Sequence, residues 1–453
     1  MASEPYFVLT LPLKPDIRQQ HILEKRFAVN GWIYNALLQK AGKRYRQMAQ
    51  TKAFRRIREA LATESDKAVR KELLQERDTL IAQYGLTRAA ICRDATGYRR
   101  YYKAHTDSPV TQNLAADVWK AVDALVQGRA ERVHPKKELR SLSGKTNQTS
   151  IKDRNGEILW KDLVLPVGRK GNAYETAALK KELRFCRIKQ EEIRGKKRYF
   201  AELVLKGTPP QKHAEESPNE TVGLALGFQK IAAVSRKEAC LHELPEKSRR
   251  LEQEKQKLQA YMERSRRAQN PANYEPDGRV RKGSREWRIS RNYQKAGKRY
   301  RELCRKQRAW QKQEQFELAR KIAAAGTTFY IEDINFAKLR RRKPNGAYAQ
   351  MRSPVGFRTI LEQKLMQQGK ELIYVQPFLL KATGFNHHTG TYQRMPLRKS
   401  WRVVDGQRVD KKLYSAFLLN HVAEDLKQFD LNACEKDFSA FVELQTEYLQ
   451  KAG

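Results

Sequence analysis

The sequence predicts a multidomain α/β protein whose C-terminal half forms a mixed α/β core. Its 453 residues are enough for about two to four domains. After residue 220, three short apolar strands come first, and helices and strands then alternate to the end of the core. This order, β-β-β-α-β-α-β-α, is that of the ribonuclease H fold.

The first half of the chain combines a β-rich region with a helical segment that follows its first strand. Phe7 to Lys14 (FVLTLPLK) alternates like a strand, and Pro15 and Asp16 punctuate its end. Apolar residues at helical spacing then predict helices to about residue 130, with a break at Pro109. We expect a β-rich domain from residues 1–15 and 132–208, with a helical domain inserted at residues 16–131.

Residues 132–208 carry the signals of short strands joined by tight turns. Asn155-Gly156 and Arg194-Gly195 are each typical of a hairpin turn, and a helical segment near Tyr174–Leu183 separates two apolar sets. Residues 209–220 are polar and predict a linker. The C-terminal domain is therefore expected at residues 221–453.

Periodicity predicts the elements of the C-terminal domain in order. They are the strands Val222–Gly227, Ile231–Ser235 and Ala239–Leu244, a charged helix Glu246–Gln269, a long helix ending at Ala325, the strand Thr328–Glu332, a helix Phe357–Gln368, the strand Glu371–Gln376 and a final helix Lys411–Lys427. Between the two charged helices lies a polar loop that contains the turn signal Asp277-Gly278.

The chain is strongly basic. Lys and Arg total 91 against 51 acidic residues, which gives a formal net charge of +40. A polyanion neutralises such an excess most simply, and a phosphate backbone is the obvious candidate. A membrane surface is the weaker alternative, because no stretch approaches the run of about 20 apolar residues that spans a bilayer. The N-terminus also shows no signal-peptide pattern, so we expect no membrane association.

The cysteines indicate neither a zinc ribbon nor a disulfide framework. The chain has 5 of them, far apart and without a C-x-x-C pair, which suits a reducing cytoplasm. His387 and His388 are adjacent but lack partner Cys or His residues at ligand spacing, so we interpret them as part of a polar loop and expect no metal site. Trp32 and the other tryptophans are treated as core residues.

The catalytic carboxylates of the fold are largely missing. Nucleases with this fold hold two cations about 3.5–4 Å apart with carboxylates from the middle of the first strand, the end of the fourth strand and the start of the last helix. These places hold Ala225, Glu332 and Lys412. A methyl group cannot bind metal, an ammonium repels it, and one Glu cannot hold a metal pair. The sequence therefore predicts that the chain is not an enzyme.

Two nearby carboxylates could in principle replace the missing ones. Asp410 precedes Lys412 by two positions, which is about 200° around a helix, so it should point away from Glu332 if the helix has begun. Asp333 follows Glu332 on a strand and should face the opposite side. We also consider that the Lys412 ammonium occupies a former metal position and pairs with Glu332. The alternative that Lys412 faces solvent carries equal weight.

At these residues the chain resembles TnpB, a family of transposon-encoded RNA-guided nucleases related to the type V CRISPR effectors. The likeness covers nearly the whole length, in five ordered blocks and two N-terminal ones. They are VGLALGFQKIAAVS (222–235), SRRAQNPANYEPDGRVRKG (265–283), FYIEDINF (329–336), KATGFNHHTGTY (381–392), LYSAFLLNHV (413–422), LTLPLK and RFAVNGWIYNALL. The family usually has Asp where this chain has Ala225 and Lys412. Many members also carry zinc-ribbon cysteines, which this chain lacks.

The resemblance implies a nuclease-dead, RNA-guided DNA-binding protein. An engineered knock-out explains Ala225 but not Lys412, so natural loss followed by retention is preferred, as in TnpB-like transcriptional repressors. The implied domains are a wedge (1–15 and 132–208), an inserted helical recognition domain (16–131) and a catalytically degenerate RuvC domain (221–453). The implied partners are one guide RNA per protein and double-stranded DNA with a short flanking motif, in the bacterial cytoplasm at the nucleoid. No cofactor besides the guide RNA is implied.

Fifteen residues are candidates for contact with nucleic acid. Those for the flanking motif or seed duplex are Tyr34, Asn35, Arg44, Gln112 and Lys120. Those for the guide RNA bracket a hairpin and are Arg184, Arg187, Lys189, Arg194, Lys196 and Lys197. Those for the heteroduplex channel are Arg266, Arg267, Arg281 and Lys282. For each of the first five taken individually, an ordinary surface residue is the favoured interpretation.

Two rival functions stay open at this point. One is an RNA-guided DNA endonuclease whose site was mutated or is completed by Asp410. The other is a basic RNA-binding protein that acts without a guide. The RNA that copurifies with the protein separates them, because a guide is one abundant structured species with a variable 3′ end.

Overall fold

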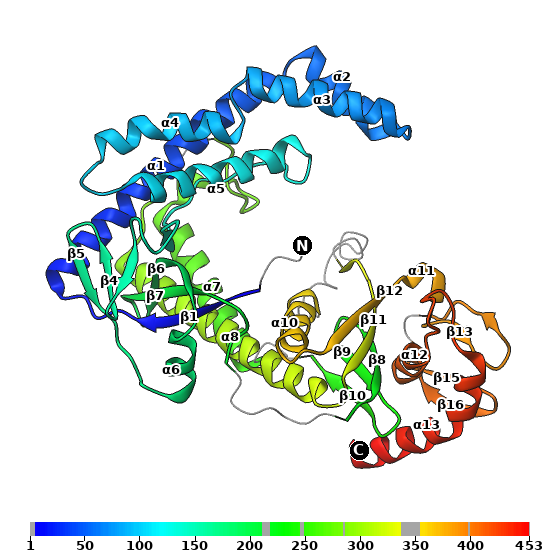
Figure 1. Ribbon diagram of the computed structural model, residues 1–453. Coiled ribbons are helices and arrows are strands. Elements are labelled where there is room, and N and C mark those ends of the chain that lie inside the picture. Colours follow the sequence, from blue (N-terminus) through cyan, green and yellow to red (C-terminus); the bar gives the residue numbers. More distant parts are fainter. Residues whose placement is uncertain are drawn as a thin grey trace. The chain divides into compact units, whose positions relative to one another are not determined.

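The computed structural model describes residues 5–210, 218–244, 249–283, 286–336, 354–396 and 399–452. The chain divides into two compact units, Met1–Gln211 and Lys212–Gly453. The division falls inside the stretch 209–220 that the sequence predicts as a linker, most of which lies outside the described residues. The finer domain boundaries stay predictions. In Figure 1 the first unit runs from blue to green and the second from green to red.

The first unit is built around a four-stranded antiparallel sheet. Its strand order is β1-β7-β6-β2. The strands are β1 (Tyr6–Pro12), β2 (Ser141–Ser143), β6 (Leu183–Ile193) and β7 (Lys196–Lys206). Because β1 pairs with β7 along its whole length, the chain between β1 and β2 is an insertion into one β-rich structure.

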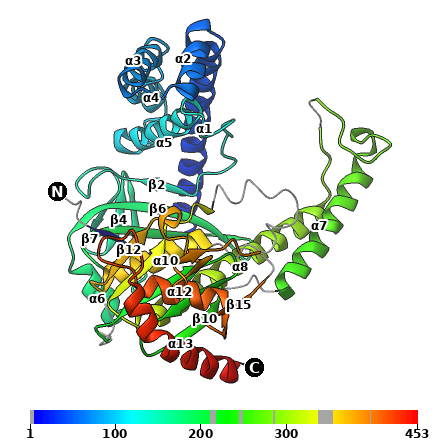
Figure 2. The same ribbon diagram turned by 90° about the vertical axis from the view of Figure 1, so that its right-hand side faces the viewer.

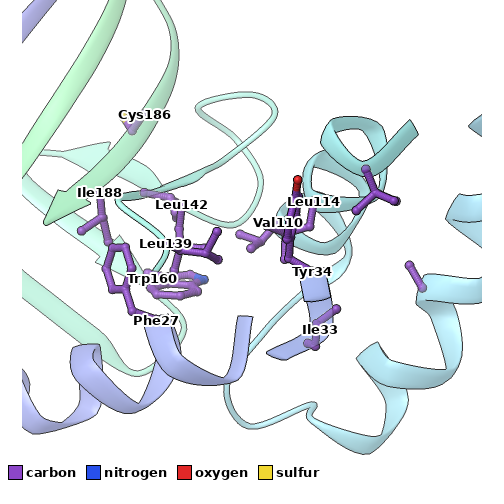
Figure 3. Close-up of a cluster of buried hydrophobic side chains, with 14 of the residues drawn as sticks. Phe27, Ile33, Tyr34, Val110, Leu114, Leu139, Leu142, Trp160, Cys186 and Ile188 are labelled. Atoms are coloured by element: carbon purple, nitrogen blue, oxygen red, sulfur yellow. The ribbon is translucent and has the colours of Figure 1, made fainter. Parts of the chain in front are cut away.

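The insertion is helical. Its five helices are α1 (Ile17–Ala49), α2 (Lys52–Thr63), α3 (Lys67–Gln83), α4 (Arg88–Tyr101) and α5 (Ser108–Val126). Asp107 caps α5 through the Val110 N–H at 3.0 Å, and its other oxygen accepts the Trp160 indole N–H at 2.9 Å. This one carboxylate therefore joins the helical segment to the β-rich part. Figure 3 shows Phe27 of α1 beside Trp160 and Ile188 in the shared core.

Both predicted hairpin turns are confirmed. A second sheet consists of β3 (Lys152–Arg154), β4 (Glu157–Trp160) and β5 (Leu163–Pro166), and α6 (Ala173–Leu179) follows. Asn155 and Gly156 have φ of 53° and 82°, and Arg194 and Gly195 have φ of 51° and 75°. Two positive φ values in a row are the geometry that two-residue hairpins favour. The helix predicted to reach Leu183 ends earlier, because Leu183 already pairs in β6.

The second unit contains a five-stranded mixed sheet of order β10-β9-β8-β11-β12. Its strands are β8 (Thr221–Leu226), β9 (Lys230–Val234), β10 (Ala239–Glu243), β11 (Thr328–Glu332) and β12 (Glu371–Val375). The first three are antiparallel, whereas β11 runs parallel to both β8 and β12. The five strands that the sequence predicts in this unit are therefore observed, and they form one sheet.

Helices cover both faces of this sheet. Alternate residues of β8 point to opposite sides, so Leu224 and Leu226 pack in a core with α8 (Arg291–Ala323) and α10 (Pro354–Gln367). Ala225 belongs to the core on the other face, with α12 (Lys411–Asn420) and α13 (Leu431–Ala452). Figure 2 shows α7 (Arg249–Gln269) beside α8, with the loop 270–283 at their far end.

The region around α12 differs from the prediction. The helix expected to reach Lys427 ends at Asn420, and α13 follows after Leu426, which has φ of 59°. Sequence analysis also missed α11 (Pro377–Leu380), β13 (Phe385–Asn386), β14 (Thr391–Tyr392), β15 (Trp401–Val404) and β16 (Gln407–Asp410). Among the helices that the structure describes, none is long and apolar enough to cross a membrane.

Candidate functional site

The fold brings Ala225, Glu332 and Lys412 together, and we call them the three core positions. Ile331 of β11 pairs with Leu224 of β8 in parallel register, and both side chains lie in the core under α8 and α10. The next residues, Glu332 and Ala225, therefore turn to the opposite face, where α12 packs. Lys412 lies in the first turn of α12.

Small residues let α12 lie directly on β8. A Cβ added to Gly223 would be 1.9 Å from the Ala416 carbonyl oxygen, so the backbones of strand and helix nearly touch. A Cβ added to Gly227 would be 1.9 Å from the Lys412 Nζ. The Lys412 ammonium thus lies against the end of β8. This placement contradicts the alternative in which Lys412 simply faces solvent.

The Lys412 ammonium and the Glu332 carboxylate each affect the pKa of the other. Among the residues that the structure describes, these two form no ion pair. Burial raises the pKa of Glu332 to about 7, against the opposing effects of the Ala382 N–H and the Lys412 charge. Burial also lowers the pKa of Lys412, although the nearby Asp410 and Glu332 charges oppose this shift.

These positions do not fit a pair of magnesium ions. Magnesium requires ionised oxygen ligands in near-octahedral geometry. Ala225 offers no ligand, Glu332 is the one carboxylate among the three core positions, and an ammonium lies beside the space. No step of metal-assisted hydrolysis can therefore be assigned to this set of residues.

Both neighbouring carboxylates already have other partners in the structure. Asp410 is the N-cap of α12, and its Oδ1 accepts the backbone N–H groups of Lys412 and Leu413 at 2.8 and 3.1 Å. The sequence argument assumed that the helix had begun at Asp410 and turned its side chain away. In the structure Asp410 is the residue before the first turn, and capping holds its carboxylate. Asp333 is exposed and pairs with Arg358 at 3.1 Å, whereas Glu332 is buried, so the two face opposite sides as expected.

Of the five candidates on the helical insertion, three contact other parts of the protein and two are exposed. Tyr34 is buried beside Val110 and Leu114 (Figure 3), with the Lys136 ammonium 4.0 Å from its ring centre. Because its ring is buried, Tyr34 is a weaker candidate for contact with nucleic acid than the exposed residues of this set. Asn35 exchanges two hydrogen bonds with the Lys136 backbone, and Arg44 pairs with Asp94. Gln112 and Lys120 are exposed.

The candidates around the β6–β7 hairpin lie on one structure, but several already have partners. Arg187 and Lys189 pair with Glu202 at 3.6 and 3.7 Å. Lys197 lies 3.6 Å from both Glu24 and Glu138. Arg184, Arg194 and Lys196 are exposed. Exposure, which Lys197 shares with these three, leaves a side chain able to reach a phosphate backbone.

The four remaining candidates lie at the end of α7 and in the loop that follows it. Arg266 donates to the Tyr274 hydroxyl at 2.9 Å and lies over the Trp287 ring. Arg267 pairs with Glu263 at 3.2 Å, and Arg281 donates to the Tyr274 carbonyl at 3.1 Å. Lys282 is exposed. The three arginines therefore hold the loop in shape, which is a role that sequence analysis did not assign.

Sequence analysis missed a basic pocket at the end of α4. A cavity of about 520 Å³ is lined by Arg99, Arg100, Lys103, Lys161 and residues at the start of α5. Lys161 donates to the Lys103 carbonyl at 2.7 Å and closes one side. Tyr101, at the end of the same helix, is 80% exposed, and Trp32 of α1 is 63% exposed rather than in the core. The segment GYRRYYK (97–103) carries the missed signal, because aromatic and basic residues are interleaved in it.

No family model matches this chain. No curated protein matches it. Among solved structures it is similar to a Cas12f1–sgRNA–target DNA complex, with a TM-score of 0.45 and 11% identity over 92% of this chain and 98% of that one. It is also similar to a CRISPR-Cas12f ternary complex, with a TM-score of 0.25 and 12% identity over 90% and 85% of the two chains. A Cas12i–crRNA–dsDNA complex has a TM-score of 0.25 and 10% identity over 81% and 56%. Because these scores are below 0.5, the argument about function depends on this chain's own residues.

Proposed function

We propose that this protein is a nuclease-dead, RNA-guided DNA-binding protein that acts by occupying its target, as a transcriptional repressor at promoters. The observation that carries the proposal is the set of three core positions. They lie together on one face of the five-stranded sheet, yet they offer only one carboxylate and, beside it, an ammonium. The order of the sequence blocks that resemble TnpB supports the RNA-guided part.

The basic composition supports a proposal in which the protein binds phosphate backbones and the RNA selects the target sequence. A net charge of +40 favours binding to phosphate backbones, which positions nucleic acid without specifying its sequence. Base pairing by a guide RNA would then choose the target, and the protein would read a short flanking motif. In this proposal, one protein binds one guide RNA in the bacterial cytoplasm, and a complex bound at a promoter blocks polymerase without any chemical step.

The first experiment identifies the RNA that the protein carries. The full chain is purified from its native host, and the bound RNA is sequenced. We expect one abundant structured RNA with a variable 3′ end that matches a promoter. A heterogeneous mixture without a common scaffold would instead support a guide-independent RNA-binding protein.

The second experiment separates binding from cleavage. The purified ribonucleoprotein is incubated with Mg²⁺ and with DNA that matches the RNA end, and with the same DNA carrying mismatches beside the flanking motif. We expect retarded migration of the matched DNA with no cleavage. Double-strand cleavage of the matched DNA would show that the protein is an RNA-guided endonuclease.

A further inference from the structure

The basic pocket at the end of α4 has walls from two parts of the first unit. Its cationic residues are Arg99 and Arg100 of α4, Lys103 shortly after that helix, and Lys161 in the turn between β4 and β5. The start of α5, which packs against α4 (Figure 1), completes the lining. A ligand in this pocket would therefore contact both the helical insertion and the β-rich part.

The pocket gathers positive charge that the surrounding residues do not offset. None of its four cations forms an ion pair with a residue that the structure describes. Asp107 is the one acidic residue of the lining, so four cations and one carboxylate give the lining a formal charge of +3. Burial, together with positive charges that include Lys161, lowers the pKa of the nearby His105. Because like charges gathered in one pocket repel each other, a bound anion is favourable here.

Asp107 is already bonded to other parts of the fold. Its Oδ1 accepts the Val110 N–H at 3.0 Å, and its Oδ2 accepts the Ser150 hydroxyl at 2.6 Å and the Trp160 indole N–H at 2.9 Å. Three uncharged donors thus hold this carboxylate in place. The cations of the pocket are therefore available to an anion from outside the protein.

Ser108 adds uncharged donors to the same pocket. It is the first residue of α5, and the first N–H groups of a helix lack intrahelical acceptors and form the positive end of its dipole. The Ser108 N–H has no acceptor among the residues that the structure describes. Its hydroxyl accepts from Gln112 Nε2 at 3.2 Å, which leaves the hydroxyl proton to be donated. Guanidinium, ammonium and helix N-terminal donors are the groups that bind phosphate.

The surroundings of the pocket favour a nucleic-acid strand over a small phosphorylated molecule or an acidic protein. Arg100, Lys103 and Lys161 are exposed, so a chain that they bind can continue into solvent. The segment GYRRYYK (97–103) places aromatic residues among the cations, and Tyr101 is 80% exposed. An exposed aromatic ring can stack on an unpaired base, which an acidic protein does not offer.

We propose that this pocket binds backbone phosphates of a single nucleic-acid strand, and that the bound strand fastens α4 and α5 to the β4–β5 turn. The Lys161 ammonium already joins the two walls, because it donates to the Lys103 carbonyl at 2.7 Å. A phosphate beside it connects the same walls through further hydrogen bonds. The inference does not rest on the proposed function, because every strand carries the same phosphate charge whether or not it is a guide.

The test uses the full-length chain after a high-salt wash has removed copurified RNA. The probes are a short uridine RNA, a DNA strand of the same length and sequence, and inorganic phosphate, all at one ionic strength. By fluorescence anisotropy, Arg99→Gln with Lys161→Gln should bind both strands about tenfold more weakly than wild type. The control is Lys180→Gln with Lys181→Gln, which removes the same charge from exposed positions outside the pocket and should change affinity by at most about twofold.

Hydrogen exchange supplies a local measurement that a general loss of binding would not reproduce. Either strand should slow the exchange of backbone N–H groups in residues 97–110 and 157–166 of wild type and of the charge-conserving Arg99→Lys. The pocket variant should lose this protection, and Arg99→Gln alone gives the same test from the α4 side if Lys161→Gln disturbs the turn. Equal affinity losses in the pocket and control variants, or no protection by either strand, would overturn the proposal. Protection by inorganic phosphate but not by the strands would also overturn it, because the ligand would then be a small anion.

Discussion

Glu332 is a buried carboxylate, and its burial makes the free energy of unfolding depend on pH. Its pKa is raised to about 7 from 4.5, mainly by burial. Between these two pH values, the folded state holds a proton that the unfolded state has lost. Folding stability therefore falls as pH rises through this window, and it levels off above the folded-state pKa.

Replacement of this carboxylate by an amide should remove the fall in folding stability with rising pH. We expect Glu332→Gln to have nearly the wild-type melting temperature at pH 4.5 and to exceed it increasingly up to pH 7.5. The shift in pKa sets an upper limit of about 3 kcal/mol on the difference. Thermal unfolding across this pH range measures the effect, with Glu424→Gln as the exposed control. A difference that does not change with pH would contradict this account.

Restoring the carboxylates tests whether the three core positions alone account for the lack of activity. Asp at positions 225 and 412 would join Glu332 on one face of the sheet, and Asp in the first turn of α12 suits the positive end of the helix dipole. We expect Ala225→Asp with Lys412→Asp to gain Mg²⁺-dependent cleavage of guide-matched DNA. The double Asn variant is the control. If the Asp variant binds Mg²⁺ yet does not cut, other parts of the nuclease have also been lost.

At the scale of the element, the contact between β8 and α12 depends on glycine. Gly223 has no room for a Cβ, which would lie 1.9 Å from the Ala416 carbonyl oxygen and 2.4 Å from the Asn420 nitrogen. Both atoms belong to the backbone, so no side chain can rotate away. The strand and the helix must separate if the residue grows.

Gly223→Ala should therefore destabilise the second unit by about 3 kcal/mol or more. Gly97→Ala is the matched control, because Gly97 is on an exposed part of α4 with open space around it. That change should be neutral or stabilise by up to about 1 kcal/mol. Limited proteolysis and thermal unfolding compare the two variants. Equal stability of both would show that α12 is not held against β8 as described.

At the scale of the whole molecule, the net charge of +40 should appear as a strong salt dependence of nucleic-acid binding. Arg100→Ala with Lys103→Ala removes two charges from the pocket at the end of α4. We expect weaker binding and a salt slope reduced by up to about 2. Tyr101→Ala should weaken binding without changing the slope, since base stacking involves no counterion release.

The control for these charge changes is Lys436→Ala, an exposed cation on α13 outside the pocket. Fluorescence anisotropy with labelled RNA at several salt concentrations gives both affinity and slope. If the pocket variants bind like Lys436→Ala, then the pocket is not part of the interface.

Sequence reasoning was most successful where the local sequence alone determines the backbone conformation. The positive φ values at Asn155-Gly156 and Arg194-Gly195 follow from local turn chemistry. The same signal at Asp405-Gly406, with φ of 43° and 72°, marked the missed β15–β16 hairpin. By contrast, the burial of Tyr34 and the meeting of His388 with Glu435 depend on tertiary packing. No local pattern encodes such contacts.

The pairing of β1 with β7 has a consequence for synthesis on the ribosome. Tyr6 pairs with Lys206, so β1 waits for its partner strand until nearly two hundred further residues have been translated. The helical insertion can fold during this interval, because its contacts are closer along the chain. Meanwhile β1 exposes an unpaired edge that other nascent chains can bind. Slow translation before Lys196 would therefore prolong the period in which this protein is most prone to aggregate.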